Sequence, residues 1–268
     1  MLVSDLYAMI NSLASFETQE AFDNSGLLLG SARSEVTGIH AALDLTERVI
    51  DEAEAAGANL IVTHHPILFH GCKRIVEEDY ESRLIARMLR LRMNLIAAHT
   101  NLDRAEGGIN DALAARCGLT DVTACDFLRV GSLVPPCPAG ELVRRLSDAL
   151  HTTIRVMGQF PEDRLIRRMG LVGGADSEDW EQALALGADA YLTGEVKHHH
   201  ALAAADAGLL ILEGGHFATE EPGIFALADT LQKRLDTIQC NLRVTISSSG
   251  GYAPPSRLES EGALSSWK

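Results

Sequence analysis

The sequence predicts an α/β fold built as two linked lobes. Short apolar runs alternate with amphipathic helical stretches along most of the 268 residues. This alternation is typical of sheets whose parallel strands are connected by helices. The segment VPPCPAG at residues 134–140 interrupts the alternation and then leads into another helical stretch. We therefore place the boundary between the lobes a little before it.

The first lobe is expected to begin with an amphipathic helix over residues 1–17. FDNSGLLLG, residues 22–30, is typical of a turn that enters a strand. Apolar runs predict further strands at residues 38–43, 59–62 and 94–98, and helical periodicity predicts helices at residues 47–56, 82–91 and 110–117. In the second of these helices we expect four apolar side chains to face inward, those of Leu84, Ile85, Met88 and Leu89.

The second lobe shows the same alternation. Its predicted helices lie at residues 141–150, 178–185 and 198–207, and its predicted strands at residues 154–157, 168–172, 190–192 and 209–212. A helix at residues 223–235 and a strand at residues 241–246 follow. We expect one lobe to span residues 1–125, completed by residues 222–246, and the other to span residues 126–221. Residues 247–268 are rich in Ser, Gly and Pro and predict a flexible tail.

Composition excludes several classes of partner. The formal charge of −14 would repel nucleic acid, although a bound metal ion can reverse the local field for a small anion. No run approaches the ~18 apolar residues of a membrane span. The start of the chain lacks the basic region of a signal peptide. The five cysteines form no C-x-x-C pair, which favours reduced thiols and a cytoplasmic location: Cys72, Cys117, Cys125, Cys137 and Cys240.

Two adjacent histidines end one of the predicted strands. In NLIVTHHPILFHG, residues 59–71, an apolar run leads directly into His64 and His65. Neighbouring side chains on a regular strand point to opposite faces, so both imidazoles can serve one site only where the strand has stopped being regular. Pro66, which cannot donate a ladder hydrogen bond, marks such a place.

Two other strand ends carry similar groups. NLIAAHTNLD places His99 and Asp103 after a strand, and LLILEGGHFATE places His216 and Glu220 after another. Ligands of open α/β sheets bind beyond the carboxyl ends of the strands, where these segments can converge. Imidazole and carboxylate suit Zn, Mn, Fe, Co or Ni, and two such ions ~3.5–4 Å apart can share a carboxylate. The candidate ligands are His64, His65, Asp103, His216 and Glu220.

These residues leave three alternatives open. Five ligands suffice for two divalent ions, and a single ion would need fewer. In the third alternative the histidines only pack or face solvent, and no metal binds.

Several polar residues near these strand ends are candidates for catalysis or for orienting the ligands. Glu195, which follows a strand in TGEVKHHH, is our candidate catalytic group, either as a general base or as a partner that holds a ligating imidazole. His99 can be a ligand, but we favour a role in orienting Asp103. Of the three consecutive histidines, which splay around a helix, we assign His198 a supporting role.

Three further polar residues suggest only local roles. Asp23 and Asn24 are expected to make the turn before the strand in FDNSGLLLG. Asp44 is expected to prepare the start of the next helix together with Thr46.

With these residues in view, the chain resembles the Nif-three-like family, whose bacterial members often carry the label GTP cyclohydrolase I type 2 homologue. The resemblance covers about residues 1–246 and rests on motifs that match in order: FDNSGLLLG, ALDLT, THHP, AHTNLD, TGEVKHHH and GGHFATE. It implies two linked α/β lobes, a ring-shaped homohexamer, and a dinuclear metal site on the five candidate ligands with Glu220 as the bridging ligand. The chain departs from the family at its Ser-, Gly- and Pro-rich end.

Two functions follow as expectations. The first is a metal-dependent hydrolase acting on a small molecule such as a nucleotide or phosphate ester, with GTP cyclohydrolase-like chemistry permitted by the ligand set. The alternative is a non-catalytic metal-binding protein, either a metal chaperone or a regulatory scaffold built on a ring. The absence of a G-x-x-x-x-G-K-[ST] loop and of a Rossmann fingerprint motivates the alternative.

Overall fold

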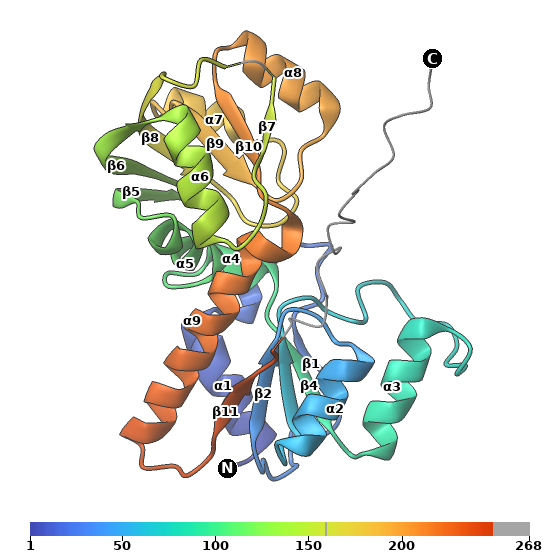
Figure 1. Cartoon of the computed structure of the whole chain (residues 1–268). Helices are drawn as coiled ribbons and strands as arrows, with labels where there is room; N and C mark the ends of the chain where they lie inside the picture. Colours follow the sequence, from blue (N-terminus) through green and yellow to red (C-terminus); the bar gives the residue numbers. More distant parts are fainter. Residues whose placement is uncertain (159, 249–268) are drawn as a thin grey trace, which may run out of the picture.

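The computed structural model describes residues 1–158 and 160–248 and contains two mixed β-sheets, one in each half of the molecule (Figure 1). The lower half in Figure 1 holds a five-stranded sheet in the order β1-β4-β3-β2-β11, and the upper half holds a six-stranded sheet in the order β5-β6-β8-β9-β10-β7. The predicted α/β class is therefore confirmed.

The five-stranded sheet is parallel except at one edge. Strands β2 (Ile39–Ala42), β3 (Leu60–Thr63), β4 (Asn94–Ala97) and β11 (Val244–Ile246) run parallel, and β1 (Gly26–Leu29) pairs antiparallel with β4. Successive side chains of β3 enter different cores: Leu60 and Val62 pack with α1 (Val3–Leu13) and α9 (His216–Thr237), and Ile61 packs with α2 (Glu47–Ala55) and α3 (Tyr80–Arg90). Helices on both faces explain why this strand is a continuous apolar run.

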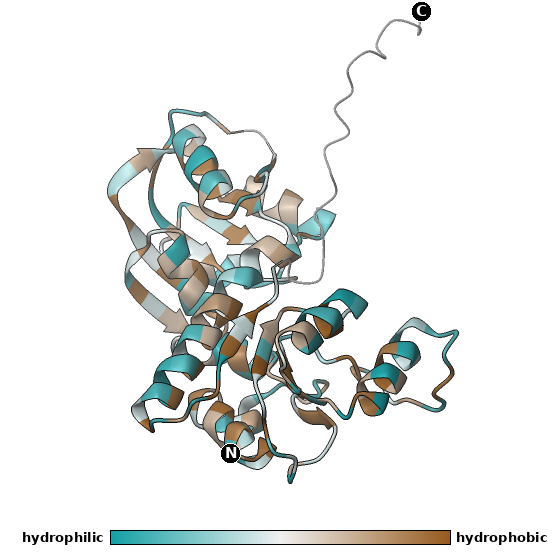
Figure 2. Ribbon diagram, turned by 60° about the horizontal axis from the view of Figure 1, so that its bottom comes forward, coloured by the Kyte–Doolittle hydropathy of each residue, from teal (hydrophilic) through white to brown (hydrophobic). Residues whose placement is uncertain are grey.

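The six-stranded sheet has a parallel centre and antiparallel edges. Strands β8 (Leu165–Leu171), β9 (Ala190–Thr193) and β10 (Leu210–Glu213) are parallel, whereas β5 (Thr120–Cys125), β6 (Leu128–Pro138) and β7 (Arg155–Met157) pair antiparallel with their neighbours. Helix α6 (Ala139–Ala149) covers one face, and α7 (Trp180–Ala185) and α8 (His198–Asp206) cover the other. Brown apolar residues in Figure 2 accordingly gather on strands and inward helix faces.

Helix α9 joins the two halves. It begins beside the six-stranded sheet and then runs along the five-stranded sheet (Figure 1). Between the two sheets it packs tightly against α5 (Ile109–Arg116). The helices are so close at Gly223 that a Cβ there would lie only 2.7 Å from the Cα of Ile109. Helix α4 (Thr100–Arg104) lies in the same region between the sheets.

Each strand and helix predicted from the sequence has a counterpart, with three corrections. The first concerns VPPCPAG, which does not interrupt the fold. Val134–Pro138 continue strand β6, whose pairing with β8 shifts register after Ser132 and resumes at Cys137. Prolines are tolerated at such an irregularity because the ladder bonds are already missing there. Neither strand β6 nor its hairpin partner β5 had been predicted, and the short helix α4 had not been predicted either.

The second correction concerns the start of α9. The helix begins at His216 rather than at residue 223, so Pro222 lies inside it. A Pro-Gly pair normally suggests a helix boundary, which is why the sequence predicted a later start. The N-cap, Gly215, has φ of +85°, a backbone conformation that favours glycine.

The third correction concerns Leu89, which is 50% exposed although it was expected to face inward. The buried side of α3 is formed by Ser82, Leu84, Ile85 and Met88. That face is narrower at the end of the helix than the apolar pattern suggested.

The chain remains docked beyond the predicted end of the fold. Ser247, the first residue of the predicted tail, is buried; its N–H donates to the carbonyl of Ala41 at 2.8 Å and its hydroxyl to Glu52 at 2.6 Å. Ser248 also bonds to Glu52. The rest of the predicted tail, residues 249–268, lies outside the described residues.

The residue ranges predicted for the two lobes remain a prediction. Strand β5, which lies within the range predicted for the first lobe, belongs to the six-stranded sheet of the other half. Within residues 1–158 and 160–248, no helix is both long and apolar enough to cross a lipid bilayer.

Candidate metal site

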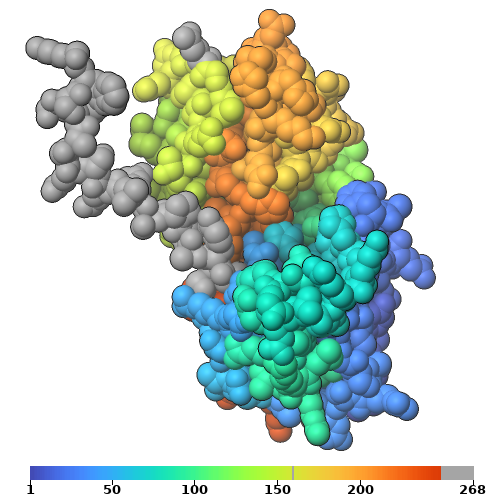
Figure 3. Space-filling view, turned by 90° about the vertical axis from the view of Figure 1, so that its right-hand side faces the viewer, coloured from blue at the N-terminus to red at the C-terminus, as the bar shows by residue number. Residues whose placement is uncertain are grey.

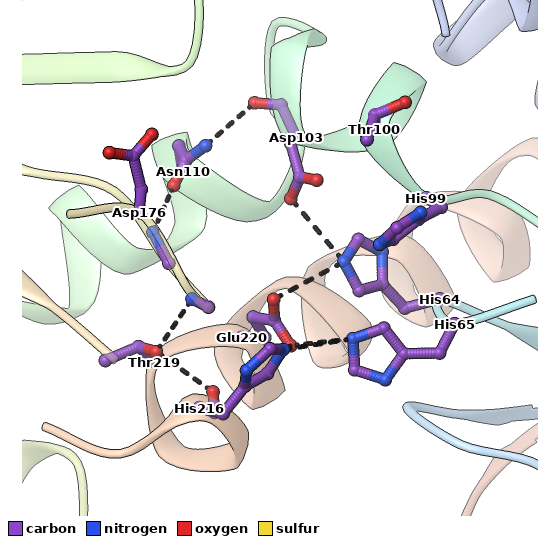
Figure 4. Close-up of polar contacts among 12 residues, drawn as sticks. His64, His65, His99, Thr100, Asp103, Asn110, Asp176, His216, Thr219 and Glu220 are labelled. Atoms are coloured by element: carbon purple, nitrogen blue, oxygen red, sulfur yellow. Dashed lines mark hydrogen bonds and ion pairs between the residues drawn. The ribbon is translucent and has the colours of Figure 1, made fainter. Parts of the chain in front are cut away.

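The strand ends that carry the predicted ligands converge between the two sheets (Figure 4). His64 and His65 directly follow β3, and His99 follows β4, its parallel neighbour. Because parallel neighbours end at the same edge of a sheet, these histidines lie close together. His216 and Glu220 arrive from the other sheet, one turn apart at the start of α9.

His64 is fully buried and has a fixed orientation. Its Nδ1 lies 2.8 Å from the carbonyl oxygen of Ala98. A carbonyl can only accept, so Nδ1 carries the proton and donates it, and the lone pair is left on Nε2. That Nε2 lies 3.5 Å from Asp103 Oδ1 and 3.7 Å from Glu220 Oε1.

His65 and His216 are oriented by carboxylates instead. His65 Nδ1 lies 2.7 Å from Asp44 Oδ1, and His216 Nδ1 lies 2.9 Å from Glu195 Oε1. Their Nε2 atoms face each other at 3.3 Å and lie 3.1 and 3.2 Å from Glu220 Oε2. In each of the three histidines an oxygen atom thus holds the outer nitrogen, and the inner nitrogen points to a common centre.

Glu220 divides its two oxygens between these histidines. Oε1 faces His64, whereas Oε2 faces His65 and His216. The carboxylate is enclosed by the loop that follows β8, because a Cβ on Gly174 would lie 2.2 Å from Oε1. Thr219 fastens this loop to α9 by accepting a hydrogen bond from the N–H of Gly174 at 3.1 Å.

Asp103 is held on α4 by a similar connection between elements. Asn110 donates to the backbone carbonyl of Asp103 at 3.1 Å and accepts from the N–H of Gly173 at 2.7 Å (Figure 4). The link joins α4, α5 and the loop after β8. It places the carboxylate of Asp103 opposite His64.

Two inward atoms of this cluster fit a metal ion. His64 Nε2 and Asp103 Oδ1 are buried and make no hydrogen bond to any described residue. A buried polar atom without a partner costs about 1–3 kcal/mol, and a divalent cation would supply the missing partner for both atoms. Ligand atoms of His65, His216 and Glu220 also lie within 4.8 Å of one another.

The pKa values of the cluster without metal also fit a site for cations. Burial lowers the pKa of His65, but hydrogen bonds to Asp44 and Glu220 outweigh burial and raise it to about 10. Burial also lowers the pKa of His216, but the hydrogen bond to Glu220 and the charge of Glu220 outweigh burial and raise the pKa to about 9. Burial raises the pKa of Asp103 to about 7. The Glu220 pKa is lowered because hydrogen bonds from the histidines outweigh its burial. Protons therefore occupy the place that metal cations could take.

The structure thus brings together all five predicted ligands, and it places Glu195 behind one of them. Glu195 is 59% exposed and contacts the outer nitrogen of His216. This is the position of a partner that orients an imidazole.

Two predicted supporting residues do not make the contacts that were expected of them. His99 was expected to orient Asp103, but its Nδ1 lies 2.7 Å from Asp23 Oδ1. Its ring packs 5.0 Å from the ring of His64, and ligand nitrogens of His64, His65 and His99 form a second group within 4.8 Å. His198 is exposed at the start of α8, and no described contact joins it to the cluster. Its position on a helix that begins several residues after β9 explains the miss.

Sequence reasoning missed two carboxylates that orient histidines. Asp23 has a fully buried side chain that accepts from His99 and from the N–H of Thr100. Its pKa is lowered, because these hydrogen bonds outweigh the effect of burial. Asp44 holds His65. It stands two residues beyond β2, so the strand-end pattern that found the histidines could have found it too.

The glycine pair in LVGGADSE, residues 171–178, was also missed. Gly174 has φ of +70° and leaves room for Glu220. A glycine pair after a predicted strand was the available signal.

Comparison with known proteins gives a consistent family match. Residues 1–250 match the sequence family Duf34/NIF3 (NGG1p interacting factor 3). A Clostridium perfringens protein named GTP cyclohydrolase 1 type 2 homolog is 33% identical over 247 residues, which cover 88% of this chain and 94% of that protein. A Streptomyces coelicolor protein of the same name is 31% identical over 260 residues, covering 91% and 90%.

The fold is similar to that of solved structures as well. The crystal structure of Staphylococcus aureus hypothetical protein SA1388 superposes with a TM-score of 0.89 at 25% identity, covering 93% of this chain and 97% of that chain.

Proposed function

This chain belongs to the Duf34/NIF3 family, and on that premise we propose that it binds two divalent metal ions and uses them to hydrolyse a small molecule. The observation that carries the proposal is the division of Glu220, whose two oxygens face different histidines from within a buried cluster. A carboxylate placed in this way suits a ligand shared by two ions.

The proposed ligands form two sets. His64 and Asp103 would hold one ion together with Oε1 of Glu220, and we call these two residues the inner set. His65 and His216 would hold the other ion together with Oε2 of Glu220, and we call them the outer set. The donor set of imidazole and carboxylate accepts Zn, Mn, Fe, Co or Ni. Two ions of this kind lower the pKa of water and polarise the bond under attack.

The chain's own residues would orient the ligating imidazoles and take up the proton that the reaction releases. Asp44 and Glu195 keep the lone pairs of His65 and His216 directed inward. Glu195 is also solvent-exposed and lines the cavity in front of these histidines, so it is our candidate for taking up a proton from the reaction.

The hydrolase proposal is tested by a substrate screen. Protein loaded with each metal is offered phosphate esters, nucleotides and cyclic small molecules, beside Glu220→Ala and Glu195→Gln variants. We expect metal-dependent turnover that Glu220→Ala abolishes and that Glu195→Gln lowers with a changed pH profile. Turnover that persists in Glu220→Ala would contradict the proposal.

A second function, non-catalytic metal delivery, is favoured by one observation. The side chains of the outer set are 24% and 35% exposed, whereas that of His64 is inaccessible. An ion held by accessible ligands can exchange with a partner. Rapid transfer of one metal equivalent to a chelator, without turnover of any screened compound, would support this function over hydrolysis.

The proposal includes an assembly and a location. The Nif-three-like resemblance supports a ring-shaped homohexamer, and the charge of −14 supports a small-molecule ligand rather than nucleic acid. The scattered cysteines support a cytoplasmic location. Light scattering of the purified full chain tests the hexamer directly.

A further inference from the structure

A cavity of about 660 Å³ opens onto the outer set and onto the two carboxylates that orient it, Asp44 and Glu195. His65, His216 and Phe217 border it on one side, and Tyr80 and Glu81 of α3 on another. Its size suits a small organic molecule. The cavity combines groups from both halves of the molecule, which are in contact in the space-filling view (Figure 3).

Carboxylates outnumber the cationic groups around this cavity, where the only imidazoles among the described residues are those of the outer set. Asp44, Glu81 and Glu195 line it, and no Lys or Arg does so among the described residues. Asp44 and Glu195 are engaged with imidazoles, but Glu81 is exposed and has no ion pair or hydrogen bond to a described residue. The pKa of Tyr80 is raised mainly by burial and, to a smaller extent, by the negative charges of Asp44 and Glu47.

Nearby cationic groups are already paired. Helix α3, which contributes Tyr80 and Glu81, also carries Arg83 and Arg87. Arg83 contacts Glu47 at 3.2 Å, and Arg87 contacts Glu47 at 2.6 Å and also contacts Asp51. These carboxylates lie on α2, so the arginines are directed to that helix rather than offered to the cavity.

The N-terminus of α2 also borders the cavity but is already capped. Thr46 lines the cavity, and its hydroxyl accepts a hydrogen bond from the N–H of Val49 at 3.2 Å. Glu47 adds a negative charge in the first turn. Both features oppose the binding of an anion at this helix end.

The remaining lining is apolar and partly aromatic. Pro66, Ile67, Tyr80 and Phe217 contribute to it, with Leu43 and Leu45. Phe217 is half-buried in the core and Tyr80 is 54% exposed, so one aromatic group is anchored and the other can adjust to a bound molecule. Surfaces of this kind favour a flat or alkyl group.

We propose that the part of the substrate held in this cavity is uncharged or cationic and carries a flat apolar group, so a phosphate chain such as that of GTP is disfavoured there. The inference deepens the proposed function and rests on it, because the molecule in the cavity is taken to be the one that reacts at the metal ions. An anionic group could still reach the ions themselves, and the inference concerns the part of the substrate that lies away from them.

The test uses three compounds that share a flat ring and differ in charge: benzamidine, benzamide and benzoate. Their affinities are measured by ligand-observed NMR for the metal-free full chain, in which no anion can coordinate a bound ion, for Glu81→Lys and for Glu181→Lys. Glu181 is a matched control, since it is an exposed acid in the first turn of α7 and does not line the cavity. Guanosine and GTP form a second pair that differs only in the phosphate chain.

We expect benzamidine to bind more tightly than benzoate, and guanosine more tightly than GTP. Glu81→Lys should weaken benzamidine about fivefold and strengthen benzoate, because an exposed charge pair contributes up to about 1 kcal/mol. Glu181→Lys should change neither. Tighter binding of benzoate or GTP, an equal response of both variants, or no measurable binding of any compound would overturn the inference.

Failure of the inference is distinguishable from failure of the proposed function. The affinities require no turnover, and metal content is measured separately. The expected order of affinities without any metal-dependent turnover would count against the hydrolase alone. The reverse order in a protein that hydrolyses some other compound would count against the substrate class alone.

Discussion

The inner and outer ligand sets differ in how the protein holds them. In the inner set, a backbone carbonyl fixes the fully buried His64, and a link through Asn110 places Asp103. In the outer set, the side chains of Asp44 and Glu195 fix His65 and His216, which border an open cavity. The backbone contact of His64 cannot be altered by changing a side chain, whereas the contacts of the outer set can. Under the proposed function, the inner set would retain its ion and the outer set would serve exchange or reaction.

The largest effect is expected from the residue that the two sets share. Glu220→Ala removes an oxygen from each set and leaves the imidazoles of His64, His65 and His216 without their common partner. We expect loss of both metal ions, a larger effect than the about 10- to 100-fold loss typical of residues that only orient ligands. Competition with a chelator measures it.

The matched control for this variant is Glu221→Ala. Glu221 is the next residue of α9 but borders a different cavity, with Arg116 and His151. It should retain both ions. Equal metal loss in Glu221→Ala and Glu220→Ala would show that α9 had been disrupted and that the shared carboxylate had not been tested.

A smaller and selective effect is expected when only the outer set is disturbed. Asp44→Asn replaces the carboxylate that accepts from His65 Nδ1. The affinity for one ion should fall about 10- to 100-fold, while the other ion is retained. A metal titration that resolves two binding steps measures the difference. Equal weakening of both steps would remove the distinction between the two sets.

A further difference is expected from pH in the metal-free protein. The pKa of His65 is about 10 in the fold and near its ordinary value of 6.5 when unfolded. A raised folded pKa stabilises the fold fully below pH ~6.5, and this contribution is lost as pH rises toward 10. The expected loss is of the order of several kcal/mol, because each unit of difference between the two pKa values corresponds to about 1.4 kcal/mol.

Denaturant unfolding at several pH values, with and without metal, measures this dependence. The metal-loaded protein should lack the decline, because bound cations replace the protons. The same decline with metal present would mean that His65 is not a ligand. His65→Ala provides the control, since it removes the titrating group.

The smallest effect is expected from His198→Ala. His198 is exposed on α8 and contacts no member of either set among the described residues. Metal content and midpoint of unfolding should match those of the unaltered protein, because an exposed substitution typically changes stability by less than about 0.5 kcal/mol. A fall in metal content would place His198 at the site in solution.

The sequence predicted the inner and outer ligands for one physical reason. Parallel strands buried on both faces are continuous apolar runs, so a polar group at the end of such a run is conspicuous. His64, His65 and His216 all follow such runs. Helix α9 was predicted to begin seven residues too late because Pro222 and Gly223 suggested a boundary. The two predicted ligands at its start still share one face at a spacing of four residues.

The residues that orient the ligands could not be predicted in the same way. Asp23 and Asp44 have local explanations, a turn and a helix start, and only the tertiary structure brings them to His99 and His65. His99 was assigned to Asp103 because the two are close in sequence, but its partner lies 76 residues away. Local patterns identify groups that can bind a metal, whereas their supporting contacts depend on how the strands are arranged.

The central claim is that this chain holds two metal ions through one shared carboxylate. Elemental analysis of the purified, metal-reconstituted full chain, beside His65→Ala, tests it most directly. The account predicts about two equivalents of a transition metal in the unaltered protein and about one in the variant. No more than one equivalent in the unaltered protein after reconstitution would contradict it.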